Sequence, residues 1–207
     1  MKFSTFIGVL LGVSCCHGYS LGPPLNACGA MFPWGHGVQA RNDSPPFSFR
    51  LNSTSYSPGD VIEVFLNTSQ EMFGDYFLEG ALIQMRPVTC KVNSIGTFSV
   101  QQQEDFLEPF GCFERDGSAL RHYAHIHIYN RTFYWTAPSK PSGHLFIRAT
   151  IARNQKNFWT NVYSDYILDK SGGTPANLNH CTTGGAVKLA VSSILAGFTI
   201  VLTLILL

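Results

Sequence analysis

The stretch from Cys28 to Gln39 constrains the fold more than any other part of the chain. Its sequence, CGAMFPWGHGVQ, holds three glycines and a proline among large aromatics. Helices and strands do not tolerate so many breakers, so we expect an ordered but non-repetitive segment. Cys28 is expected to form a disulfide bond, for which Cys112 is the best candidate partner and Cys90 the alternative. A bridge to Cys112 would close a loop of more than eighty residues and, in the chain-entropy model, contribute about 4–5 kcal/mol.

The N-terminus has the composition of a secretory signal peptide. Lys2 precedes an apolar run over residues 3–13, and small residues follow. We therefore expect a leader over 1–18, cleaved after Gly18. Its removal leaves 13 basic and 13 acidic residues without a Lys/Arg cluster. Nucleic acid and acidic membrane surfaces are therefore not expected partners, because both require concentrated positive charge.

Four N-glycosylation sequons fit a secretory route. They begin at Asn42, Asn52, Asn67 and Asn130. Each lies at or near a predicted turn or strand end, where a glycan can remain in solvent. We expect at least two of the four to be used.

The middle of the chain predicts β-strands. Apolar residues alternate or cluster over 47–51, 61–66, 81–88, 97–101, 122–129, 133–135, 145–151 and 158–168. Turns are expected at 56–60 and at 115–118, where Pro and Gly occur. Seven or eight short strands with turns between them predict an all-β, antiparallel β-sandwich.

Several pieces of the sequence, in order, resemble the reeler (reelin) domain family. They are CGAMFPWGHGVQ (28–39), YSPG (56–59), FLEGALIQMR (77–86), GTF (96–98), Cys112, WTAP (135–138) and FW (158–159). The chain departs from the family pattern by one extra residue before His36 and by Ala81 in place of a Phe. The resemblance implies an immunoglobulin-like sandwich, which we place at residues 19–170. It also implies adhesion, matrix contact or innate-immune recognition, as in insect defense proteins.

The C-terminal part changes character. Residues 171–188 are small and polar, and 189–207 are nineteen residues without a charge. The latter are long enough for a membrane-spanning helix, but they also fit a GPI signal. The absence of a basic residue after this segment favours the GPI interpretation, with Ser171, Gly172 and Gly173 as attachment candidates. A second disulfide, Cys90 with Cys181, is expected only if Cys181 is retained.

Four histidines and one tryptophan are candidates for a functional role. His122, His125 and His127 suggest a metal site, but no third ligand type is placed beside them by spacing, so no metal is expected. Trp34 and His36 are possible ligand contacts at one tip of the domain. The favoured interpretation, however, places Trp34 in the core with Trp135 and Trp159, and makes His36 a buried or lining histidine with a backbone partner. An exposed Trp34 would favour a carbohydrate platform.

No nucleophile constellation or phosphate-binding loop is visible, so we expect neither catalysis nor a cofactor. The expected function is a binding module on the extracellular face of the plasma membrane, tethered through its C-terminus. Its expected partner is an extracellular or cell-surface ligand, with microbial or matrix glycans as candidates. The alternative is an accessory or truncated relative of ferric-chelate-reductase-like proteins. That chemistry needs haem ligands within a membrane bundle, and the single hydrophobic C-terminal segment contains no histidine.

Overall fold

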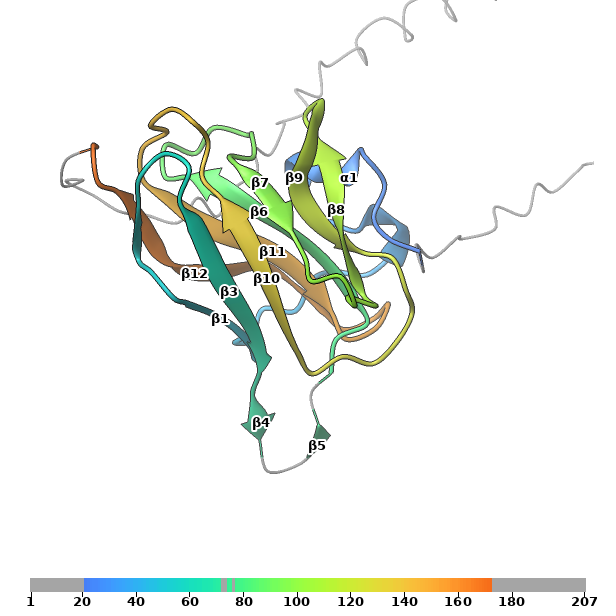
Figure 1. Ribbon diagram of the computed structural model, residues 1–207. Coiled ribbons are helices and arrows are strands. Elements are labelled where there is room, and N and C mark those ends of the chain that lie inside the picture. The colour runs from blue at the N-terminus through green and yellow to red at the C-terminus, as the bar shows by residue number, and fades with distance from the viewer. Residues whose placement is uncertain (1–20, 72–73, 76, 173–207) are drawn as a thin grey trace, which may run out of the picture.

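Two β-sheets pack face to face in the computed structural model, which describes residues 21–71, 74–75 and 77–172 (Figure 1). One sheet has the order β1 (Phe47–Leu51), β3 (Val61–Thr68), β10 (Asn130–Thr136), β7 (Thr97–Ser99). The other has the order β2 (Ser55–Tyr56), β12 (Phe158–Asp169), β11 (Leu145–Ala152), β6 (Gly80–Pro87), β9 (Arg115–His122), β8 (Leu107–Cys112). A short hairpin of β4 (Gln70–Glu71) and β5 (Gly74–Asp75) extends from one end. All described strand pairs are antiparallel except β2 with β12, so the predicted sandwich is confirmed.

The core lies between the two sheets and follows the alternation of the sequence. In β3, Ile62, Val64 and Leu66 point inward and are buried. Trp135 of β10 is fully buried, and its indole N–H donates to the carbonyl of Ile95 at 2.8 Å. The polar edge of this large side chain is thus satisfied without contact to solvent.

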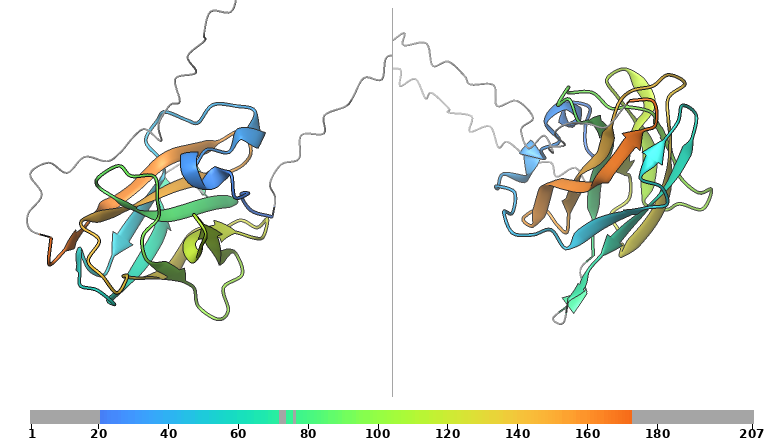
Figure 2. Two further views of the ribbon diagram at one scale, coloured as in Figure 1. Left: turned by 90° about the horizontal axis from the view of Figure 1, so that it is seen from above. Right: turned by 90° about the vertical axis from the view of Figure 1, so that its left-hand side faces the viewer.

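Strand β6 is buried on both faces, as its nearly continuous apolar sequence predicts. Ile83 and Met85 face the core between the sheets. Leu82 instead belongs to a second cluster with Cys28 and Cys112, beneath the N-terminal segment. The segment in blue covers this outer face of the six-stranded sheet (Figure 2).

The strand predicted over 122–129 is wrong. Strand β9 ends at His122, and residues 123–129 form a connection whose Ile128 makes an isolated bridge with Leu78. The edge of β6 is already occupied by β9, because β6 pairs with Ala119–Arg121. An alternating pattern makes a strand only where a neighbouring edge is free.

The turn predicted at 115–118 is also misplaced. It lies at Phe113 and Glu114, which both have φ of 56° and connect the paired residues Cys112 and Arg115. Two left-handed residues suit the tight hairpin of β8 and β9. Strand β8 was not predicted, and it contains Pro109, a residue that is unfavourable in a central strand. Proline is tolerated here since β8 lies at the edge of the sheet.

The side chain of Asp169 connects the C-terminal end of β12 to neighbouring loops through hydrogen bonds. Its carboxylate accepts hydrogen bonds from Tyr56 Oη, the Ser142 and Gly143 amides, and Ser171 N and Oγ. Burial acts to raise the pKa of Asp169, but hydrogen bonds from Ser171, Gly143 and Ser142 outweigh it and lower the pKa to about 2. The Gly172 amide also donates to the Asp169 carbonyl at 3.0 Å. Residues 171 and 172, which were predicted to belong to the linker, are therefore hydrogen-bonded to Asp169.

The predicted leader (1–18), Gly173, the rest of the linker and the hydrophobic segment 189–207 lie outside the described residues. The predicted C-terminal helix is therefore not tested. Between residues 21 and 172, in the part described, no helix is both long and apolar enough to cross a membrane.

Candidate functional site

A disulfide pins the N-terminal segment to the six-stranded sheet. Cys28 is bonded to Cys112, with Cα atoms 5.7 Å apart, which confirms the preferred pairing. Cys28 lies in α1 (Ala27–Ala30), a single turn that ends where Met31 adopts φ of 54° and donates its N–H to Ala27. A 3₁₀ turn, η1 (Trp34–His36), follows. The segment is thus ordered, and its two helical elements are only four and three residues long.

Four side chains of the sheet hold this segment by its carbonyl groups. Arg86 Nη2 donates to the carbonyls of Cys28 at 2.8 Å and Gly29 at 3.2 Å. Gln84, Arg148 and Thr150 donate to the carbonyls of Cys28, Ala30 and Met31 respectively. Carbonyls at a helix end lack helical partners and attract positive charge. Burial, assisted by the charge of Arg148, lowers the pKa of Arg86 to about 10, so it remains protonated at neutral pH.

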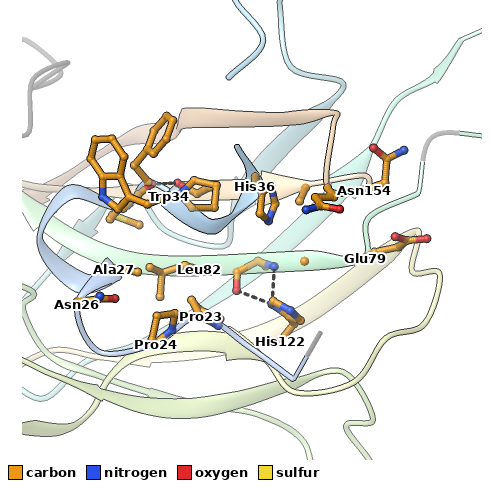
Figure 3. A pocket seen from close by; sticks show the side chains of 18 of the residues that line it. Pro23, Pro24, Asn26, Ala27, Trp34, His36, Glu79, Leu82, His122 and Asn154 are labelled. Atoms are coloured by element: carbon orange, nitrogen blue, oxygen red, sulfur yellow. Dashed lines mark hydrogen bonds between the residues drawn. The ribbon is translucent and has the colours of Figure 1, made fainter. Parts of the chain in front are cut away.

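A pocket of about 240 Å³ lies between the anchored segment and the sheet (Figure 3). Ala81 and Leu82 of β6 form part of its floor. Pro24 and Ala27 lie along one wall, and Trp34 and His36 along the other. Polar groups gather at the opposite end from Trp34, so the pocket has an apolar and a polar end.

Trp34 is exposed at the rim of the pocket. Its side chain is 70% exposed, whereas Trp135 and Trp159 are 0% and 4% exposed. The core interpretation of Trp34 is therefore wrong, while that of the other two is confirmed. Phe32 supports the indole at a ring distance of 4.5 Å and itself packs edge-on against Phe158. A large aromatic held by its neighbours yet open to solvent is suited to contact a ligand.

His36 lines the same wall and is half-buried. It packs edge-on against Phe158 at 5.0 Å, and its Nδ1 is buried without a hydrogen-bond partner. Burial lowers the pKa of His36, a backbone hydrogen bond with Gln155 acts against this, and the charge of His122 lowers it further. His36 is therefore neutral at pH 7 and has an unused polar atom.

His122 forms part of the opposite wall. Its Nδ1 lies 3.1 Å from the backbone nitrogen and 3.3 Å from the carbonyl oxygen of Ala81, so β6 holds this edge of the ring in either tautomer. The ring stacks on Phe106 at 6.0 Å. His122 thus lines the pocket with its Nδ1 held by the backbone of β6.

Glu79 brings together the other two histidines. His127 Nε2 lies 2.7 Å from one carboxylate oxygen, and His125 Nε2 lies 3.3 Å from the other. His127 also stacks on Phe77 at 3.9 Å. Sequence spacing could not place Glu79 here, because the contact depends on the connection after β9. Within the described ranges, no cluster of three or more His, Cys, Asp or Glu is arranged to hold a metal.

Asn154 was not predicted and lines the polar end. Its Oδ1 accepts hydrogen bonds from the amides of Lys156 and Asn157 and from the Asn157 side chain. Three donors on the oxygen leave the amide NH₂ as the group available to the pocket. An Asn within the turn 153–157 was the only available signal, and such residues are common in turns for purely local reasons.

The remaining predicted sites are dispersed. Asn42 lies in the exposed loop before β1, Asn52 directly after β1, Asn67 in β3 and Asn130 at the start of β10. Cys90 is disulfide-bonded, but Cys181 lies outside the described residues, so their pairing stays a prediction. Ser171 and Gly172 are held in the turn on Asp169.

Comparison with known proteins identifies relatives of two kinds. Residues 26–175 match the Reeler domain. The proposed ferric-chelate reductase 1 of Danio rerio is 31% identical over 88% of this chain, but the match covers only 30% of that protein. The proposed defense protein Hdd11 of Hyphantria cunea is 28% identical over 78% of this chain and 95% of its own length. The crystal structure of the human F-spondin reeler domain superposes with a TM-score of 0.51 at 16% identity, covering 64% of this chain and 94% of that one.

Proposed function

Because the chain belongs to the reeler domain family, we propose that it is a non-catalytic, extracellular binding module that recognises a microbial or matrix glycan. The observation that carries this proposal is the pocket beneath the N-terminal segment, with Trp34 exposed at its rim. Sugars have apolar C–H faces that pack on aromatic rings and hydroxyl groups that need directed hydrogen bonds. The apolar end at Trp34 and the polar end at Asn154 and His122 offer both.

The volume of the pocket is suited to a small part of a ligand. A volume of about 240 Å³ lies just below the range of about 300–1,000 Å³ that is usual for small-ligand pockets. We infer that one sugar ring with its substituents occupies it, while the rest of a glycan remains outside. Neutral His36 and the oriented Asn154 amide would hydrogen-bond to the ring substituents.

The relatives favour recognition over redox chemistry. The match extends over nearly the whole length of the insect protein whose name indicates defense, but over less than a third of the fish reductase. A second candidate, an accessory relative of the reductases, rests on the 31% identity to the fish protein. A reduced-minus-oxidised spectrum of the purified chain distinguishes the two, since a clear haem band would favour the second.

Attachment to the outer face of the plasma membrane through the C-terminal segment forms part of the proposal. Ser171 and Gly172 are engaged with Asp169, so lipid attachment C-terminal of Gly172 would disturb the domain least. Phosphatidylinositol-specific phospholipase C should release the protein from cells. Retention of the protein with residue 207 still present would instead indicate a membrane-spanning helix.

Binding of the domain, residues 19–172, to a glycan array and to microbial surfaces tests the ligand. Trp34→Ala should weaken binding about tenfold, because stacking on an aromatic contributes about 0.5–1.5 kcal/mol beyond its buried area. Tyr129→Ala is the matched control, since Tyr129 is an exposed aromatic that does not line the pocket. Equal effects of the two substitutions, or no binding to any glycan or microbial surface, would contradict the proposal.

A further inference from the structure

The three sequons of the four-stranded sheet lie on its outer face. In β1 and β3 the inward residues are Phe49, Leu51, Val64 and Leu66. By alternation, Asn52 and Asn67 point away from the core. Asn130 is the register partner of Asn67 and shares its face. The N-terminal segment, whose residues line the pocket, covers the outer face of the other sheet, on the opposite side of the sandwich (Figure 2).

Asn52 and Asn130 present their amide nitrogens in similar ways. Asn52 Oδ1 accepts the N–H of Glu63 at 3.0 Å, and Asn130 Oδ1 accepts the N–H of Thr68 at 3.3 Å. Both residues are exposed. With the oxygen held by the neighbouring strand, Nδ2 is directed away from it. A glycan on Nδ2 would leave both hydrogen bonds intact, because glycosylation does not alter Oδ1.

Asn67 has different surroundings. It is half-buried in a strand with neighbours on both sides, opposite Ser48 of β1 and Asn130 of β10. Its Nδ2 donates to the carbonyl of Phe65 at 3.5 Å. Asn130, by contrast, has only β3 beside it, because β7 pairs with residues 134–136 of β10. Side chains directly opposite on neighbouring strands have Cβ atoms about 4.5–5.5 Å apart, which leaves little space for two glycans.

We propose that the mature protein carries N-glycans at Asn52 and Asn130, that Asn67 is unmodified, and that the glycans cover the face opposite the pocket. Transfer from a lipid diphosphate donor joins Nδ2 to the anomeric carbon of the sugar. It breaks the bond from that carbon to the diphosphate, which leaves with one amide proton. A glycan on Asn67 would crowd the glycan on Asn130, its partner directly across on β10, so chains modified at both positions do not accumulate. The ligand-binding side remains open.

Site mapping of the full chain, expressed in cells with a secretory pathway, tests this inference without any variant. Enzymatic release of N-glycans converts modified asparagines to aspartates, which peptide mass spectrometry locates. Aspartate is expected at positions 52 and 130, with asparagine retained at 67. Aspartate at 67, or asparagine at 52 or 130, would overturn the proposal. Occupancy of Asn42 does not bear on it.

Three matched variants remove one sequon each without changing its asparagine. Thr54→Ala and Thr132→Ala should each increase gel mobility by one glycan, and Ser69→Ala should leave it unchanged. The difference should vanish after glycan release. A mobility change in Ser69→Ala, or none in the other two, would refute the assignment whether or not the protein binds a sugar.

Discussion

The guanidinium group of Arg86 donates a 2.8 Å hydrogen bond to the carbonyl oxygen of Cys28. This contact joins the central strand β6 to the half-cystine of the N-terminal segment. It is a charged donor to a neutral acceptor in a buried environment, and such bonds contribute more than neutral ones. The position of the pocket wall therefore depends on an arginine that does not line the pocket.

Arg86→Met should destabilise the domain by about 1–3 kcal/mol, because the carbonyls of Cys28 and Gly29 lose a buried donor. Methionine retains much of the apolar volume, so the loss is mainly that of hydrogen bonds. Urea unfolding at pH 7 measures it. Arg50→Met is the control, since Arg50 is exposed and lies over Phe65 on the other sheet. An unchanged midpoint for Arg86→Met would contradict the role assigned to this contact.

Replacing both Cys28 and Cys112 by alanine should cost about 2–5 kcal/mol. The bridge spans 84 residues, and removing it gives the unfolded chain more freedom. Thermal unfolding without reductant compares the double variant with the native protein. A peptide map without reduction should recover the Cys28–Cys112 pair, and recovery of Cys28 linked to Cys90 would show that the pairing is wrong.

The β-sandwich could be predicted because the pattern of apolar residues within each strand indicates which of its side chains are buried. The alternation of β1 and the apolar run of β6 each follow from which faces are covered. The segment 122–129 shows the limit of this argument. Its alternation is as regular as that of β1, yet β9 already occupies the edge of β6. Strand pairing is decided by competition for an edge, which one segment does not reveal.

The candidate site was predicted only in part. Trp34 and His36 lie in a breaker-rich segment, so their involvement could be inferred. Glu79 and Asn154 could not, because they reach the pocket from turns at the ends of β6 and β11. The exposure of Trp34 was predicted wrongly, since a large aromatic beside a disulfide is usual in a core, and the sequence does not show that Trp34 lies at a rim.

The lowered pKa of Asp169 predicts that the domain loses stability in acid. Its pKa is lowered from 3.8 to about 2, so the unfolded chain takes up the proton first. The stabilisation is complete above about pH 4 and is lost as the pH falls through the range from 3.8 to about 2. Asp169→Asn should lack this component and should be less stable at pH 7. Urea midpoints between pH 2 and 6 measure both, and parallel profiles for the two proteins would contradict the assignment.

His36 predicts a second pH dependence, at higher pH. Its pKa in the folded domain is lowered from 6.5, chiefly by burial, so protonation favours the unfolded state. Stability from the neutral imidazole is present above pH 6.5 and declines as the pH falls below it. His36→Phe keeps a ring against Phe158 and removes the titrating group. The difference in unfolding free energy between the two proteins should therefore change between pH 7 and 5.

Under the proposed function, sugar binding by the native protein should also respond to this protonation, because Nδ1 of His36 becomes a donor only when the ring is charged or changes tautomer. Titrations with a bound glycan at pH 7.5 and 5.5 measure this response. A binding constant that changes equally in His36→Phe would exclude His36 as its source.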